Sequence, residues 1–464
     1  MTKYIALVCV ALCLLACFLS SCSNKRTVNL SANIKSNQVI VAEEIRLLPG
    51  FTVQDGCSVM LYARKYFFGP GVFRTEGSLE INGIGQDAAV TADIHFRGFL
   101  CSSWDLDYEL IEKANYNRVT KVIGIARVKL SGLRFNGLRT AVLVSIVSPA
   151  VKLHFQGCQF NDCELTSIVR GSGPSIVYED VDITRSRIGA LYTSEANLSY
   201  VLFRRVRTSD ESLRCVTEVP VGAELSFGAF LEFDSCYIDV QSIECKVGTV
   251  VVDASEIRAR SVNLVCGRFE ASDSLISCNS LRVSSALCRV AESVIQTGSM
   301  GLTQVSGQYP TSTEIVLSLL CCDGDSLESF LSNCRQLAVH RSIFVPRGAS
   351  LDNPVALDIH TAVLSKLNDT ILLGSFDVLD EAPPGGVLTR QIVYDGKAWL
   401  FAFSKWSVRF PAKFPPRADS LKGDLSMLLE AVFSNQSKTY VQFRLRTISS
   451  RLSSSELIEL RNDF

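Results

Sequence analysis

Residues 231–295 read LEFDSCYIDVQSIECKVGTVVVDASEIRARSVNLVCGRFEASDSLISCNSLRVSSALCRVAESVI, and isoleucine recurs in this stretch at a fixed interval. Ile238, Ile257, Ile276 and Ile295 are spaced 19 residues apart and define a column of equivalent positions, here called column 0. The residues seven, five and two positions earlier, and five positions later, form further columns of apolar or small residues. Columns −7 and −5 differ by two residues, as do columns −2 and 0, and a period of two is typical of a β-strand.

Column 0 continues in both directions once the interval is allowed to vary. Its spacing is 23 to 30 residues upstream of Ile238 and reaches 49 residues between Ile295 and Phe344. The longest interval fits either two coils or one coil with a large loop, and we expect residues 315–320 to form an extra strand or coil. The further members of column 0 are Phe135, Phe160, Ile183, a defective Thr208, Phe344 and Ile371.

The step from column −5 to column −2 is three residues, which breaks the alternation and predicts a tight bend. Each repeat is therefore predicted to be a strand, a bend, a second strand and a loop of variable length. Asn-Gly and Asp-Gly hairpin turns are sparse, which disfavours a meander. The pattern predicts an all-β fold, a parallel β-helix in which equivalent residues of successive coils stack inward. The expected bend residues are Gly157, Asp180, Ser235, Asp253, Asp273 and Glu292.

This pattern resembles the right-handed parallel β-helix class, which includes pectate-lyase-like enzymes and haemagglutinin-like adhesins. The longer coils resemble the former and the 19-residue coils resemble the latter. The resemblance covers about residues 34–376 and is one of repeat pattern, without a catalytic motif. It implies a function on polysaccharides or at a cell surface.

The N-terminus resembles a bacterial lipoprotein signal. Lys3 precedes an apolar run of 16 residues, Tyr4–Leu19, which is shorter than the roughly 20 residues that a spanning helix needs. Leu19-Ser20-Ser21-Cys22 resembles a lipobox, so we expect residues 1–22 to form a lipoprotein signal that is cleaved before Cys22, with Cys22 acylated as the mature N-terminus. A second match ends at Cys17, and an ordinary secretory signal or a single membrane anchor remains an alternative.

The partner expected for such an anchor is a membrane, since several acyl chains give stable attachment. Residues 44–56 (EIRLLPGFTVQDG) resemble a segment of secreted Bacteroidota proteins, which agrees with the lipobox. Residue 23 is not aspartate, and by resemblance to enterobacterial sorting this favours the outer membrane. Whether the chain faces the periplasm or the cell surface stays open.

The columns stop after Phe376, near a Pro-Gly-rich stretch. We expect a β-helix over residues 23–376, with an N-terminal cap over about 27–65 and regular coils over about 122–376. Residues 377–464 are expected to form a C-terminal cap or small α+β module. The predicted strands there are Leu388–Tyr394, Trp399–Phe403 and Tyr440–Arg446, and the predicted helices are Gly423–Phe433 and Ser453–Asn462, besides a helical insertion near 103–115.

Composition excludes several functions. The 46 basic and 47 acidic residues leave a net charge of −1, so the basic field that nucleic-acid binding requires is missing. The four histidines lack metal-ligand spacing, and no phosphate loop, dinucleotide fingerprint or nucleophile elbow is found. We therefore expect no metal site, no cofactor and no nucleic-acid partner.

Outward positions of the strands are the places to look for chemistry. Asp180 and Asp182 are predicted to face Arg205 and Arg207 of the next coil, as ion pairs of a solvated ladder or as part of a paired-carboxylate site. Outward Leu275, Val294 and Ile343 are apolar, so a loop, the C-terminal module or a partner is expected to cover them. The candidate catalytic residues are Asp180, Asp182, Arg205, Arg207, Glu232 and Glu256.

Residues 397–417 interleave aromatic and basic side chains. Aromatic faces stack on sugars and also form protein hot spots, so Trp399, Trp406 and Arg409 are candidate ligand-binding residues. The alternative is that these aromatics only pack on the last coil.

The 17 cysteines first resemble a disulfide framework. Thirteen remain after Cys22, an odd number, and Cys158, Cys236 and Cys288 occupy inward columns. We therefore predict that most mature cysteines fill the core as small apolar residues.

The function predicted from the sequence is a membrane-anchored β-helix lipoprotein that acts as a scaffold for a saccharide or an envelope protein. The alternative is a polysaccharide lyase or glycoside hydrolase, which needs two or three carboxylates, or carboxylates and basic residues, that converge about 5–10 Å apart. The missing Asp-Asp and His-Gly signatures of pectin-cleaving families favour the scaffold.

Overall fold

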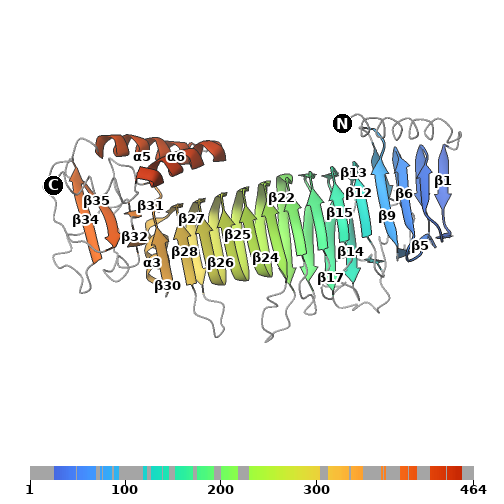
Figure 1. Ribbon diagram of the computed structural model, residues 1–464, viewed down its shortest axis with the longest axis horizontal. Coiled ribbons are helices and arrows are strands. Elements are labelled where there is room, and N and C mark those ends of the chain that lie inside the picture. The colour runs from blue at the N-terminus through green and yellow to red at the C-terminus, as the bar shows by residue number, and fades with distance from the viewer. Residues whose placement is uncertain are drawn as a thin grey trace, which may run out of the picture. The chain divides into compact units, whose positions relative to one another are not determined.

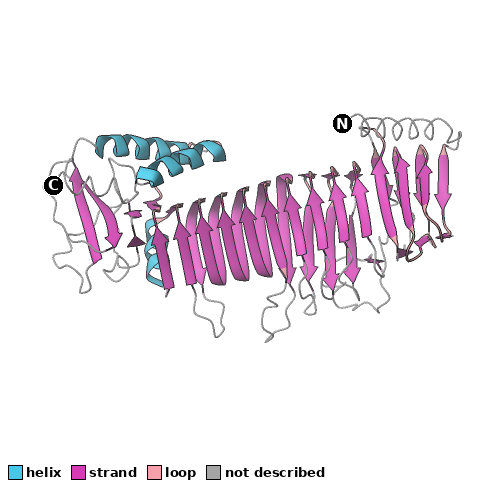
Figure 2. Cartoon of the chain, viewed as in Figure 1, coloured by secondary structure: helices cyan, strands magenta, loops and turns pink. Residues whose placement is uncertain are grey.

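The computed structural model of the chain is built mainly from parallel β-strands, which lie side by side along each unit (Figure 1). The chain forms two compact units, residues 1–209 with 217–220 and residues 210–216 with 221–464. The described helices all belong to the second unit (Figure 2). The structure describes residues 26–48, 50–68, 74–75, 77–85, 88–92, 119–122, 127–137, 139–145, 152–170, 175–192, 200–217, 229–303, 312–333, 336–348, 367–368, 370–372, 387–394, 397–404, 418–434 and 436–451.

The first unit is a stack of coils with three sides, and the strands on each side are parallel and form a ladder. The first ladder contains β1 (Thr27–Leu30), β4 (Glu44–Leu47), β7 (Lys65–Phe68), β10 (Ala89–Ala92), β13 (Arg134–Asn136), β16 (Gln159–Asn161) and β19 (Asp182–Thr184). The second contains β3 (Gln38–Val41), β6 (Ser58–Ala63), β9 (Ser78–Gly83), β12 (Arg127–Ser131), β15 (Lys152–Gln156), β18 (Ser175–Glu179) and β21 (Tyr200–Arg204). The third side contains β2 (Asn33–Ile34), β5 (Thr52–Val53) and β8 (Arg74–Thr75), and then β11 (Val119–Val122), β14 (Arg139–Ser145), β17 (Glu164–Arg170) and β20 (Arg187–Tyr192).

Residues 207–209 at the start of β22 (Arg207–Thr217) pair with β19 and continue the first ladder. The second unit contains the 19-residue coils, whose strands are long, and then longer coils with short strands. Its solenoid strands are β23 (Phe230–Asp234), β24 (Tyr237–Asp253), β25 (Glu256–Ser272), β26 (Leu275–Ala291), β27 (Val294–Thr303), β28 (Ser312–Val316), β29 (Leu319–Cys322), β30 (Gln336–His340), β31 (Ile343–Pro346), β32 (Leu367–Asn368) and β33 (Thr370–Leu372).

The residues predicted to be loops in the 19-residue coils instead form a third strand side. Each of β24, β25 and β26 spans 17 residues, and the pairing of β24 with β25 is interrupted at Gln241 and Gly248, which marks two corners. Column +5 lies on this third side, and Ile243 is buried there. The prediction of a loop was wrong because a short coil leaves too few residues for one.

The column register itself is confirmed. Ile238, Ile257, Ile276 and Ile295 pair in parallel register on neighbouring strands and are all buried. The fold is therefore the predicted all-β parallel β-helix. Equivalent aromatic residues also stack inside the first unit, where Phe155 and Tyr178 have ring centroids 5.1 Å apart with nearly parallel planes.

The long interval after Ile295 contains two coils. Leu320 of β29 pairs with Ile295 on one side and with Phe344 on the other, so it belongs to column 0. Residues 315–320 thus belong to an extra coil, as predicted, and contain the end of β28, the bend at Leu317 and the start of β29. Helix α3 (Gly324–Asn333) follows directly after this coil.

The bend before column −2 is made by one residue in the left-handed backbone conformation. In the coil of Ile257 this residue is Ala254, with φ 47°, and not Asp253 as predicted. Left-handed φ is uncommon for residues other than glycine. The bend residue's N–H donates to the next coil, as from Ser235 to the carbonyl oxygen of Asp253 at 3.0 Å, so pairing helps to hold the conformation. The bend residues are Gly132, Gly157, Asp180, Arg205, Ser235, Ala254, Asp273, Glu292, Leu317 and Arg341.

A ladder of buried serines lies directly after the bends of the second unit. The hydroxyl of Ser274 accepts a hydrogen bond from the backbone N–H of Ser255 at 3.1 Å and donates to the carbonyl oxygen of Ser272 at 2.6 Å. The same pattern continues through Ser293 and Ser318. Each hydroxyl therefore satisfies a backbone donor of the neighbouring coil, which explains why small polar residues occupy an inward column.

The C-terminal segment ends the solenoid. The antiparallel hairpin of β34 (Val387–Tyr394) and β35 (Lys397–Ser404) pairs with β33 and agrees with the two strands predicted there. Helix α5 (Ala418–Phe433) contains the predicted helix and starts earlier. Residues 440–446 lie in helix α6 (Lys438–Arg451), so the predicted strand was wrong. The predicted helices at 103–115 and 453–462 lie outside the described residues.

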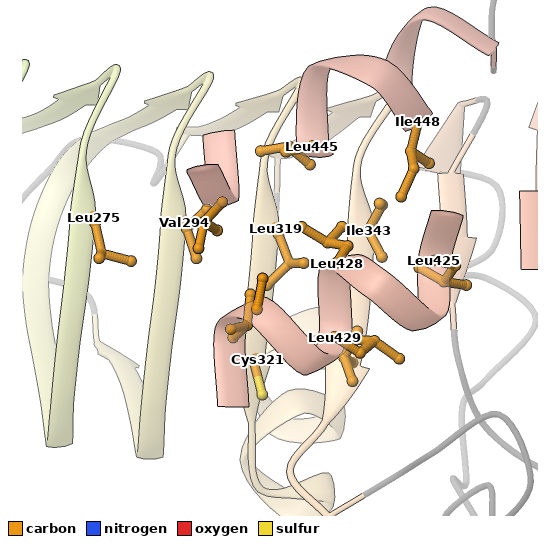
Figure 3. Packing of buried hydrophobic residues seen from close by; sticks show 14 residues of the cluster. Leu275, Val294, Leu319, Cys321, Ile343, Leu425, Leu428, Leu429, Leu445 and Ile448 are labelled. Atoms are coloured by element: carbon orange, nitrogen blue, oxygen red, sulfur yellow. The ribbon is translucent and has the colours of Figure 1, made fainter. Parts of the chain in front are cut away.

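The residue directly before column 0 points outward in each coil and forms column −1. The two C-terminal helices, here called the cap, cover the apolar members of this column. Leu425 and Leu428 of α5 and Leu445 of α6 pack with Leu319 and Ile343 of the solenoid (Figure 3). This confirms that the outward apolar residues are covered, and it identifies the C-terminal module as the cover. Val441, Leu445 and Ile448 lie on one face of α6 and are buried, and this helical stripe outweighs the strand-like alternation of residues 440–446.

Candidate functional site

An ion-pair network lies on the first unit at two successive bends. Arg205 donates from Nε to Asp180 Oδ1 at 2.6 Å and from Nη2 to Asp180 Oδ2 at 2.9 Å. The same Nη2 also donates to Glu179 Oε1 at 2.9 Å. These hydrogen bonds hold the pKa of Asp180 below its ordinary value. Both side chains of the Asp180–Arg205 pair are about half exposed, so solvent screens their attraction.

Glu179 joins this network to a histidine. Its Oε2 lies 3.0 Å from His154 Nε2, and both side chains are mostly buried, with about one fifth of each exposed. A histidine beside a carboxylate is a common arrangement for proton transfer, but Glu179 is also bound by Arg205. The sequence pattern did not single out Glu179. Its position could have indicated it, since Glu179 directly precedes the bend residue and pairs in register with the basic residue Arg204 of the next coil.

The other predicted pair of this unit is not bonded. Asp182 and Arg207 occupy paired positions on β19 and β22, and both are exposed. Among the residues that the structure describes in this unit, no ion pair joins them. The four predicted residues therefore give one bonded pair, Asp180–Arg205, and one pair that only shares the strand register.

Glu232 lies in an acidic group of the second unit. Asp234 of β23 pairs in register with Asp253 of β24, and Glu232 is two residues before Asp234 on the same strand. Burial, and then the charges of Asp234 and Asp253, raise the pKa of the Glu232 carboxyl. A carboxyl group with a raised pKa has the property of a general acid.

Glu256 is paired with a basic residue of its own strand. Arg258 Nε and Nη2 both contact Glu256 Oε1, at 2.9 Å and 2.7 Å. The Arg258 guanidinium also lies over the ring of Tyr237 on the neighbouring strand, 5.9 Å from its centroid. The predicted residues Glu232 and Glu256 thus belong to two local groups, and Glu256 is already neutralised by Arg258.

Basic residues of α6 reach the same outward face. Arg446 Nη2 contacts Asp273 Oδ1 at 2.7 Å and Glu292 Oε2 at 3.1 Å. Lys438 is half-buried, and burial lowers the pKa of its ammonium although Asp273, Asp253 and Glu256 act in the opposite direction. The sequence held no signal for Lys438, because only the folding of the cap brings α6 back to β25.

The predicted aromatic site is described only in part. Trp399 lies in β35, where it pairs in register with Ile392. Trp406 and Arg409 lie outside the described residues, as does the predicted lipidation site Cys22. The ligand-binding role of these residues stays a prediction.

The described cysteines behave as core residues. The ten cysteines whose side chains the structure describes are free of disulfides, and nine of them are buried, with Cys57 as the exception. Burial raises the pKa of Cys158 to about 11 and that of Cys266 to about 12. For the described part of the chain, the prediction of buried apolar filler is confirmed.

Within the described residues, no group of three His, Cys, Asp or Glu side chains is arranged to hold a metal ion. Of the described helices, none is both long enough and apolar enough to cross a membrane. Comparisons with known protein families, curated proteins and solved structures found no match to this chain.

Proposed function

We propose that this chain is a cell-envelope lipoprotein whose β-helix is a scaffold that binds a saccharide or an envelope protein. In this proposal the chain is cleaved before Cys22, and acyl chains on Cys22 hold the protein on the outer membrane. The apolar run before Cys22 and the lipobox-like Leu19–Cys22 support the anchor.

One observation carries the scaffold role. Three of the six candidate charged residues are engaged in local ion pairs, Asp180 with Arg205 and Glu256 with Arg258. In the described part of the chain, Asp182 and Arg207 are not brought together in an ion pair. A hydrolytic or lyase site needs carboxylates that face a common substrate position, and charges that neutralise each other are less available for it. A stacked β-helix whose charges are partly paired and whose apolar outward residues are covered is suited to display a binding surface to a ligand.

A screen for binding and for product separates the two roles. The mature chain is tested on a glycan array, and the same saccharides are then assayed for new reducing ends and for unsaturated products. We expect binding without product. Release of either product would overturn the scaffold role.

The anchor is tested separately. Labelled palmitate is expected to enter the wild-type chain in a Gram-negative host and not the Cys22→Ala variant, because acylation needs the thiol. Cys17→Ala is the matched control, since it alters the competing lipobox and is expected to keep the label. Label retained by Cys22→Ala would contradict the proposed site.

The alternative of a glycoside hydrolase or polysaccharide lyase rests on Glu232. Its raised pKa, in a group with Asp234 and Asp253, is the feature expected of a proton donor. If the product assay is positive, Glu232→Gln is expected to abolish turnover, and Asp180→Asn is expected to leave it unchanged. Equal activity of Glu232→Gln and wild type would exclude this assignment.

A further inference from the structure

Column −1 of the second unit changes its character where the cap ends. Leu275, Val294 and the later members are buried under α5 and α6, whereas Tyr237 is 38% exposed and the side chain of Glu256, 13% exposed, is paired with Arg258. The boundary brings together Tyr237, Glu256, Arg258 and Lys438, which we call the ledge. We propose that the ledge is a binding subsite for a sugar ring of a neutral polysaccharide, which rests on the binding role proposed above.

Tyr237 supplies the apolar surface of the ledge. Its side chain is an outward residue of β24 and 38% exposed, and it pairs in register with Glu256 of β25. Neighbouring strands lie about 4.8 Å apart, so the ring and the carboxylate are side by side on one face. An exposed aromatic ring next to fixed polar groups offers the C–H face of a sugar a partner that water does not provide.

Glu256 and Arg258 supply an acceptor and a donor in a fixed geometry. Both contacts from Arg258 go to Glu256 Oε1, at 2.9 Å and 2.7 Å. Among the described residues, Glu256 Oε2 and Arg258 Nη1 have no hydrogen-bond partner. A carboxylate oxygen and a guanidinium nitrogen held together match two adjacent hydroxyl groups, of which one donates and the other accepts.

Lys438 adds a second donor at the edge of the cap. It is the first residue of α6 and half-buried, and its charge interacts with those of Asp253, Glu256 and Asp273. Within the described part of the chain, none of these carboxylates lies within ion-pair distance of the ammonium. Lys438 thus adds a positive charge at the edge of the ledge, where its ammonium can donate to a ligand.

The balance of charge selects a neutral ligand. The face around the ledge carries three cations, Arg258, Lys438 and Arg446, against the carboxylates of Asp253, Glu256, Asp273 and Glu292. A polyanion would meet more negative than positive charge here and would be repelled, whereas a neutral polysaccharide carries no charge that this face would repel.

Tyr237→Ala is the test, and Tyr440→Ala is its matched control. Tyr440 is 39% exposed and has the guanidinium of Arg444 5.1 Å from its ring centroid, so it has the same exposure and the same type of cation–π contact, but it lies on α6 and is not a ledge residue. The full chain is purified in a detergent without a sugar headgroup. Its affinity is measured for soluble β-glucan, xylan and mannan, and for polygalacturonate as the anionic comparison.

We expect binding to at least one neutral polysaccharide, a loss of about tenfold in Tyr237→Ala, and a change of less than about twofold in Tyr440→Ala. Lys438→Met is expected to weaken the same binding without changing the thermal midpoint. Equal affinities of wild type and Tyr237→Ala, or binding to polygalacturonate alone, would overturn the ledge and leave the scaffold role intact. A chain that binds neither saccharides nor envelope proteins would overturn both.

Discussion

At the residue scale, column −2 shows how one inward position tolerates two chemistries. In the second unit most of its members are serines, and Cys236 and Cys158 hold the same position in other coils. The thiol of Cys236 lies 3.4 Å from the carbonyl oxygen of Asp234, two residues earlier, which is the contact that the serine hydroxyls make. Serine and cysteine therefore fill the same small space, and serine in addition satisfies a backbone N–H of the neighbouring coil.

Removing one hydroxyl from this ladder should cost measurable stability. Ser274→Ala leaves the N–H of Ser255 buried without an acceptor, and an unsatisfied buried donor costs about 1–3 kcal/mol. We expect a lower midpoint in urea, followed by circular dichroism. Ser261→Ala, at an exposed position of β25, is the control and should unfold as the wild type does. Equal midpoints for the two variants would show that the ladder contributes no net stability.

The buried thiols should be chemically inert in the native chain. Because burial raises the pKa of Cys266 to about 12, this thiol stays protonated at pH 8, and the thiolate is the reactive form. Cys57 is only half-buried and is expected to react first among the described cysteines. Iodoacetamide labelling at pH 8, read by peptide mass spectrometry, compares the two sites. Labelling of Cys266 as fast as Cys57 in the native chain would contradict the buried core.

At the element scale, the cap combines an apolar contact with a polar edge. Leu428 and Leu445 are fully or almost fully buried against the solenoid, whereas Arg446 makes exposed contacts with Asp273 and Glu292. Exposed ion pairs contribute about 0–1 kcal/mol, and burial of a leucine contributes more. The apolar contact should therefore determine whether the cap is docked, and the ion pairs should mainly set its register on the solenoid.

Two substitutions in the cap test this ranking. Leu428→Ala is expected to destabilise docking by about 2–5 kcal/mol, because it leaves a cavity and loses apolar contact. Hydrogen exchange should rise throughout α5 and α6, while β24 and β25 keep their protection. Arg446→Ala should raise exchange only slightly, and Met427→Ala, exposed on the same helix as Leu428, is the control. A larger effect of Arg446→Ala than of Leu428→Ala would mean that charge and not apolar burial holds the cap.

At the scale of the whole molecule, the repeat was predictable because a stacked coil repeats the same environment. Every coil places one residue in column 0 and one in column −5. The apolar residues Ile238 and Phe233 therefore recur as apolar residues at the same positions of other coils, and this recurrence is visible in the sequence. The sequence predicted that Leu275 and Val294 are covered, since apolar outward residues must be buried, but it did not show which segment covers them. That α6 provides this cover, and that Arg446 of α6 contacts Asp273 and Glu292, depends on packing between distant segments that has no periodicity.

In the second unit, the position of an insertion within the coil should decide whether the fold tolerates it. Intervals between members of column 0 vary naturally, so extra residues between strands should leave the columns intact. An insertion of eight Gly and Ser residues into the connection of residues 304–311, between β27 and β28, doubles its length and should cost only about 0.6 kcal/mol of closure entropy. One residue inserted between Val250 and Val251 instead reverses the inward and outward alternation of the strand that follows. We expect the first variant to keep the thermal midpoint of the wild type and the second to lose its cooperative transition in differential scanning calorimetry. If the single insertion were as stable as the long one, the register of the columns would not be what determines this fold.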